Sequence, residues 1–139
     1  MKRLLAVISL YVLAGSASAE TNPLLGSFTH DFTRPSNQSV WTVKKVGTAW
    51  KVRVHGANET VRAKRMSDAE KAAFWEQMWW PLEKAKDAQC LRIEKELQGL
   101  MCYVHGNTRV TIDALSKNKS DYFYFDSMGG LMEIRRKGT

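Results

Sequence analysis

Apolar and polar residues alternate in short runs along most of the chain, and turn-forming residues separate these runs. A period of two is typical of antiparallel strands that bury one face. Nine runs fit this pattern and predict strands at 25–32, 39–46, 49–55, 60–65, 91–94, 100–104, 109–112, 121–126 and 131–135. Because the runs are short and closely spaced, we expect hairpins to connect most of them.

One segment has the features of a helix instead. Ser67 and Glu70 are spaced as a capping box, in which each side chain bonds the backbone amide of the other residue. This motif predicts a helix at 68–79. Pro81 keeps the preceding residue out of helical geometry, so the helix should end there, and Pro81 suits the first position of a second short helix at 81–88.

These elements predict a mainly β (α+β) fold in a single small domain. The expected architecture is a strongly curved antiparallel sheet or small barrel of about seven to nine strands, with one main helix packed on it. The chain has 139 residues, of which 44% are hydrophobic and 25% charged, as expected for one globular domain. Its length excludes a two-domain enzyme, a repeat array and a polytopic membrane protein.

Residues 1–19 have the features of an export signal. Two basic residues precede an apolar stretch at 4–13, and an Ala-x-Ala motif ends at Ala19. The apolar stretch is too short to span a bilayer, which takes about twenty residues. We therefore expect cleavage near Ala19 and a soluble periplasmic or secreted domain at 20–139. Loss of the two basic residues lowers the formal net charge from +7 to +5.

The two cysteines, Cys90 and Cys102, predict one disulfide, because an exported chain folds in an oxidising compartment. They fall on neighbouring predicted strands. Closing a loop this short stabilises a fold by about 3 kcal/mol in the chain-entropy model. The alternative is a catalytic cysteine with His105 as its base, but no glycine-flanked nucleophile motif surrounds either cysteine.

The sequence predicts no catalytic residues, cofactor or metal site. His55 and His105 lie at similar hairpin ends, yet no histidine pair has the spacing of a helical zinc site. Neither a G-x-S-x-G elbow nor a phosphate-binding glycine loop occurs in the domain. Asp121 and Asp126 flank an aromatic strand, where acidic residues commonly serve as polar strand ends. We therefore expect a protein that binds rather than an enzyme.

The predicted strands between residues 41 and 65 carry a basic face. Strand alternation turns five basic side chains outward as a candidate anion-binding site: Lys44, Lys51, Arg53, Arg62 and Lys64. With a turn centred on Ala57 and Asn58, Arg53 stands opposite Arg62. The same register pairs Lys51 with Lys64. Like charges opposed across a sheet destabilise it, so this pattern indicates an anionic partner.

Aromatic residues form a second candidate surface. Trp79 and Trp80 stand at the predicted helix end, where adjacent side chains diverge, so one of the pair should be exposed. Tyr122 and Tyr124 share one face of a strand. Exposed aromatics are common anchors in protein interfaces, and we assign all four residues to partner binding.

Two functional hypotheses follow. The first is an inhibitor or immunity-type protein that contacts a cell-wall-degrading enzyme or a toxin through these aromatics and the polar loop at 33–39. The second is a binder of the anionic envelope surface, whether lipopolysaccharide, phospholipid or polysaccharide, through the basic face. Nucleic acid has the same charge, but export separates the domain from most of it. A curved sheet of this size also raises the possibility of an apolar cavity for a small ligand.

Overall fold

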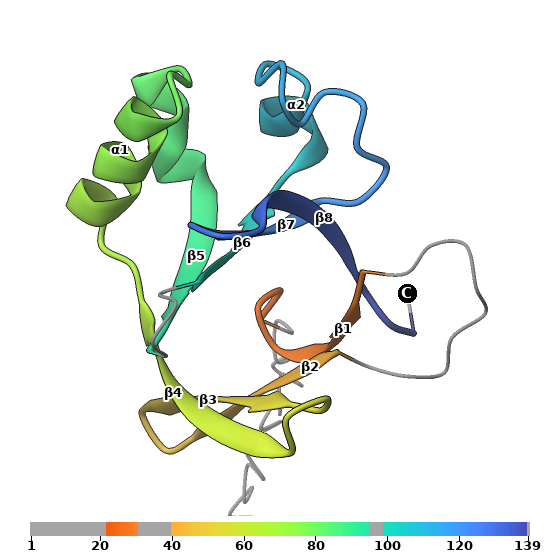
Figure 1. Ribbon diagram of the computed structural model, residues 1–139. Coiled ribbons are helices and arrows are strands. Elements are labelled where there is room, and N and C mark those ends of the chain that lie inside the picture. Colours follow the sequence, from red (N-terminus) through yellow and green to blue (C-terminus); the bar gives the residue numbers. More distant parts are fainter. Residues whose placement is uncertain (1–21, 31–39, 95–98, 139) are drawn as a thin grey trace, which may run out of the picture.

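Eight antiparallel strands form a closed barrel in the computed structural model, which describes residues 22–30, 40–94 and 99–138 (Figure 1). Each strand pairs with the next along the chain, and β8 pairs with β1 to close the barrel. The strands are β1 (Gly26–Thr29), β2 (Trp41–Val46), β3 (Ala49–Val54), β4 (Glu59–Arg65), β5 (Ala88–Ile93), β6 (Gly99–Val104), β7 (Tyr122–Asp126) and β8 (Gly130–Arg136). This architecture confirms the predicted small, mainly β domain.

The interior of the barrel forms one core. Phe28 packs edge-on against Tyr122, with ring centroids 5.0 Å apart. Trp41 stacks on Tyr124 at 4.8 Å. Because an eight-stranded barrel is just wide enough for side chains to fill, these aromatic pairs favour a packed interior over a cavity for a small ligand.

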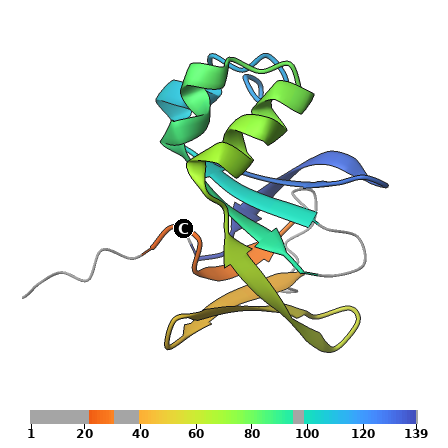
Figure 2. The ribbon, with the colours of Figure 1, turned by 90° about the vertical axis from the view of Figure 1, so that its left-hand side faces the viewer.

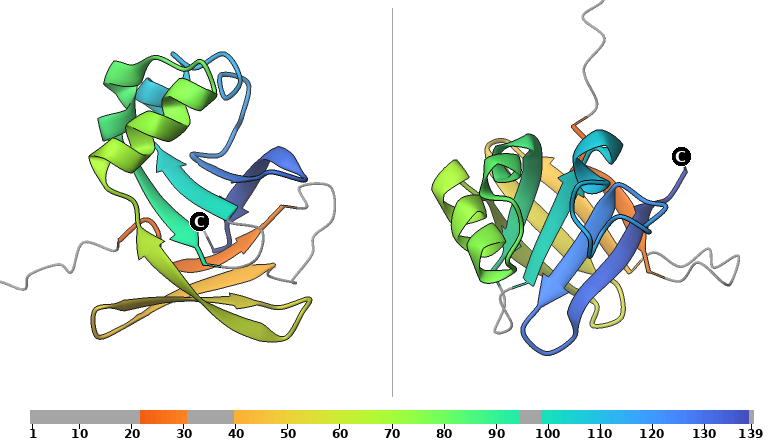
Figure 3. Two further views of the ribbon diagram at one scale, coloured as in Figure 1. Left: turned by 60° about the vertical axis from the view of Figure 1, so that its left-hand side comes forward. Right: turned by 90° about the horizontal axis from the view of Figure 1, so that it is seen from above.

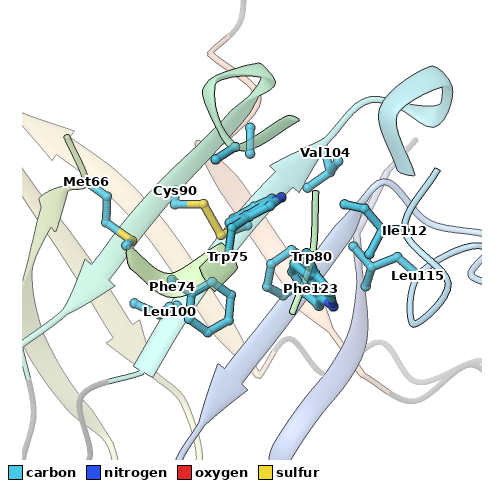
Figure 4. Close-up of a cluster of buried hydrophobic side chains, with 13 residues drawn as sticks. Met66, Phe74, Trp75, Trp80, Cys90, Leu100, Val104, Ile112, Leu115 and Phe123 are labelled. Carbon is cyan, nitrogen blue, oxygen red and sulfur yellow. A yellow bond between two sulfur atoms is a disulfide. The ribbon is translucent and has the colours of Figure 1, made fainter. Parts of the chain in front are cut away.

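A second core lies outside the barrel, over strands β5 to β7. Three helices cover it: α1 (Asp68–Gln77), the 3₁₀ helix η1 (Leu82–Asp87) and α2 (Gly106–Arg109) (Figures 2 and 3). Strand β6 contributes to both cores, because Met101 belongs to the inner cluster whereas Leu100 and Cys102 belong to the outer one (Figure 4). Burial of both faces explains why the sequence of β6 is almost continuously apolar.

Helix α1 begins at the predicted capping box, which the structure confirms. The Ser67 hydroxyl accepts from the Glu70 amide at 3.2 Å, and the Ser67 amide donates to the Glu70 carboxylate at 3.3 Å. This amide donor lowers the pKa of Glu70. Buried Lys71 then joins the helix to β5, because its Nζ donates to the Ala88 carbonyl oxygen at 2.6 Å while it pairs with Asp68 at 3.1 Å.

The prediction of a strand at 109–112 is wrong. Helix α2 and a series of turns occupy this region, where Ile112 and Leu115 enter the outer core. The segment has no sheet edge to join, because β6 pairs directly with β7. Arg109 instead holds the following loop by an ion pair with Asp121, at 3.2 Å between Nη2 and Oδ1.

Two predicted features, the leader at 1–19 and the loop at 33–39, lie outside the described residues. Within the part of the chain that the structure describes, no helix is both long enough and apolar enough to cross a membrane.

Candidate functional site

Helix α1 ends in a turn that separates two adjacent tryptophans. Met78 caps the helix, and Trp79 follows with a φ of 59°. The Trp79 amide donates to the Glu76 carbonyl at 3.1 Å, and the Trp80 amide donates to the Trp75 carbonyl at 3.0 Å. These two bonds define a Schellman motif, in which the residue after the cap is left-handed and is usually glycine.

The second tryptophan of the pair, Trp80, is buried at 8% exposure. It packs edge-on against Trp75 at 5.1 Å, against Phe74 at 5.6 Å and against Phe123 of β7 at 5.6 Å between ring centroids (Figure 4). A hydrophobic contact between the residues at the positions of Trp75 and Trp80 is the usual companion of a Schellman motif. The packing of Trp80 in the outer core therefore holds the turn in place.

The first tryptophan, Trp79, is 95% exposed. A left-handed conformation costs a residue with a side chain about 1–2 kcal/mol, and this side chain gains almost no burial to offset that cost. Leu82, at the start of η1, is 51% exposed and adds to the apolar surface that follows the turn. Strain without a structural benefit is a feature of binding and catalytic sites, so residues 78–81, the Trp79 turn, are the strongest candidate site.

The two tyrosines predicted to bind a partner are partly buried and pack against the inner core. Tyr122 donates through its hydroxyl to the Pro23 carbonyl at 2.8 Å, which joins the segment before β1 to β7. Burial raises the pKa of Tyr122. Burial, together with a hydrogen bond to Asp126, raises the pKa of Tyr124 to about 12. Because Trp80 is buried and both tyrosines are partly buried, Trp79 is the residue of the predicted aromatic set that is fully open to a partner.

The predicted disulfide between Cys90 and Cys102 is confirmed. The two residues stand directly opposite each other on β5 and β6, with Cα atoms 4.1 Å apart, and both are completely buried. They belong to the same outer core as Trp75 and Trp80. The disulfide therefore lies in the core that supports the Trp79 turn.

The basic face is present, but its predicted register is wrong by two residues. Lys51 stands opposite Arg62, and Arg53 stands opposite Thr60. The connection is a four-residue turn at 55–58 that ends with Asn58 at a φ of 48°, and Arg53 donates to its side-chain oxygen at 2.5 Å. Because the shift is by two residues, every side chain keeps its predicted face.

The remaining basic residues extend this face across neighbouring strands. Lys44 of β2 stands opposite Lys51, and Lys64 of β4 stands opposite Arg92 of β5. Arg92 is paired with Glu70 of helix α1 at 3.4 Å. Strands β2 and β3 lie on the side of the barrel away from α1, whereas β4 leads into α1 (Figure 2).

Each of the two histidines predicted at hairpin ends makes a hydrogen bond, but His105 caps helix α2 and does not lie in a hairpin. His55 Nε2 is 2.7 Å from the Thr42 hydroxyl, and His105 Nδ1 accepts from the Asn107 amide at 3.3 Å. Across residues 22–30, 40–94 and 99–138, no group of three or more histidine, cysteine, aspartate or glutamate side chains is placed to hold a metal ion.

No protein-family model, curated protein or solved structure matches this chain. The candidate site therefore depends on the geometry described above. The sequence predicted one exposed tryptophan at the helix end, but it did not indicate that this residue would be Trp79 in a left-handed conformation. The useful signal was Pro81, since proline commonly follows one or two residues after a helix cap.

Proposed function

We propose that this protein is a small exported binding protein of the inhibitor or immunity type, and that it acts on a cell-wall-degrading enzyme or a toxin by direct contact. The observation that carries the proposal is Trp79, a large apolar side chain held in a strained conformation and 95% exposed. Tryptophan is among the residues most enriched at the energetic centres of protein interfaces.

The hydrogen bonds and core packing that hold the Trp79 turn favour binding of a partner to a preformed surface. The Schellman bonds fix the backbone, while Trp80 and the disulfide lie in the core below. A ring that is already positioned loses little conformational freedom on binding, so more of the contact energy contributes to affinity. The disulfide is also consistent with an exported protein, since such bonds persist in oxidising compartments.

The test compares two single variants at exposed apolar positions. The disulfide-bonded chain from Glu20 to Thr139 is immobilised, and envelope and secreted extracts are passed over it at low and high salt. Trp79→Ala removes the proposed anchor. Met128→Ala is the matched control, because Met128 is 79% exposed in the turn between β7 and β8.

We expect one stoichiometric protein to survive high salt on the parent and on Met128→Ala. Its enzymatic or toxic activity should fall when the parent protein is added in equimolar amount. Trp79→Ala should weaken this binding by about 30-fold or more, the effect of losing a hot-spot residue. Equal retention and equal inhibition by Trp79→Ala and the parent would overturn the assignment of the site.

A further inference from the structure

The outer faces of β2, β3 and β4 carry a line of directly opposed cations. Lys44 stands opposite Lys51, and Lys51 stands opposite Arg62. Neighbouring strands are about 4.8 Å apart, so the three charges cross the sheet at close spacing. Lys64 lies two residues beyond Arg62 on the same strand and the same face.

These four cations are not neutralised by the rest of the described structure. Among residues 22–30, 40–94 and 99–138, no ion pair within 4 Å joins Lys44, Lys51, Arg62 or Lys64 to a carboxylate. Arg92 provides the contrast, because it faces the same side and is paired with Glu70. The folded sheet thus holds like charges together where an external anion can reach them.

A shallow hollow of about 510 Å³ lies beside this line. Lys51, Arg62, Lys64 and Arg65 contribute to its lining, and Glu94 is the carboxylate at the same site. Four basic side chains against one carboxylate give its lining a net positive charge, which suits an anionic group. The Glu94 carboxylate repels an anion at this site. Its removal should therefore strengthen anion binding, whereas removal of a cation should weaken it.

An exposed apolar residue accompanies the cations. Val46 ends β2, is 66% exposed, and lies on the same face as Lys44 because side chains alternate along the strand. Basic side chains next to an exposed apolar side chain are typical of proteins that bind the surface of a membrane. A soluble polyanion would use the charges but not Val46.

We propose that the outer face of β2 to β4 docks on an anionic phospholipid surface, with Lys44, Lys51 and Arg62 among the lipid phosphates and Val46 in the headgroup layer. Helix α1 lies on the opposite side of the barrel, away from β2 and β3 (Figure 2). A protein bound in this way keeps the α1 side free. The inference does not depend on the function proposed for Trp79.

The experiment is co-sedimentation of the chain from Glu20 to Thr139 with vesicles of phosphatidylglycerol and phosphatidylcholine, and with phosphatidylcholine alone. We expect binding to the anionic vesicles that weakens as salt rises, because counterions screen exposed charges. Lys51→Gln with Arg62→Gln should weaken binding by about 25-fold, since each basic residue near such a surface contributes about fivefold. Lys86→Gln with Lys117→Gln removes the same charge from other exposed positions and should have a much smaller effect.

Two further variants distinguish docking on lipid from attraction to any polyanion. Glu94→Gln should strengthen vesicle binding, and Val46→Asn should weaken it while binding to soluble heparin stays unchanged. Trp79→Ala should bind vesicles as the parent does, so failure of this proposal and failure of the Trp79 assignment can be told apart. Absence of binding to anionic vesicles overturns the proposal. Equal loss in both charge-removing pairs, or tight heparin binding with no effect of Val46→Asn on vesicles, also overturns it.

Discussion

Replacing Trp79 by glycine should make the protein more stable while it removes the proposed binding anchor. Trp79 occupies the left-handed position of a Schellman motif at a φ of 59°, where glycine is the favoured residue. Its side chain is 95% exposed, so deletion removes almost no buried surface. The substitution therefore acts mainly on backbone strain.

The magnitude follows from two opposing contributions. Relief of the left-handed strain stabilises the folded state by about 1–2 kcal/mol. Glycine also makes the unfolded chain more flexible, which offsets this gain by about 0.4–1 kcal/mol. We expect Trp79→Gly to raise the free energy of unfolding by about 0.5–1 kcal/mol, which raises the Tm by about 2–5 °C for a domain of this size.

Thermal and urea unfolding of three proteins test this reasoning: the parent, Trp79→Gly and Trp79→Ala. Alanine removes the ring but keeps a Cβ atom in the strained conformation, so Trp79→Ala should stay within about 0.5 kcal/mol of the parent. Both variants should lose partner binding to the same extent. A Tm for Trp79→Gly at or below that of Trp79→Ala would refute the claim that this turn is strained.

Three further predictions concern the support of the fold. Lys71→Met should lower the free energy of unfolding by about 1–3 kcal/mol, because the Ala88 carbonyl loses its buried partner; an unchanged urea midpoint would contradict this. Reduction of the Cys90–Cys102 disulfide should lower stability by about 3 kcal/mol, measured by melts of oxidised and reduced protein in matched buffers, and coincident melts would argue against it. Tyr124 has a pKa near 12 in the folded state and near 10 when unfolded, so the unfolded chain loses this proton first and stability should fall between pH 10 and 12. Tyr124→Phe should flatten that fall, and parallel pH profiles of the variant and the parent would disprove the assignment.

Local patterns in the chain were sufficient for most of the fold. Strand alternation predicted the inward side chains of β2 to β4, since each strand buries one face and exposes the other. The capping box at Ser67 predicted the start of α1 because its bonds connect residues three positions apart. The pairing of Cys90 with Cys102 followed from their being the two cysteines of the chain.

Two features of the fold could not be predicted from the alternation of apolar and polar residues. The run at 109–112 alternates like a strand, but it is not one because β6 and β7 already pair with each other. The register of β3 and β4 depended on the left-handed conformation of Asn58, which shifts pairing by two residues without changing any face. Alternation contains neither constraint, because it is the same for a strand that finds no partner and for a register shifted by two residues.

The candidate sites likewise combine features that the sequence predicted with features that only the tertiary structure decided. The amino-acid sequence alone established five outward cations on adjacent strands and two adjacent tryptophans before a proline, because alternation and helix termination are local properties. Tertiary packing decided which tryptophan is available: Phe123, on a strand far along the chain, helps to bury Trp80 and leaves Trp79 in solvent. Barrel closure likewise left Tyr122 and Tyr124 only partly exposed, since the side chains on that face of β7 pack against the strands across the interior.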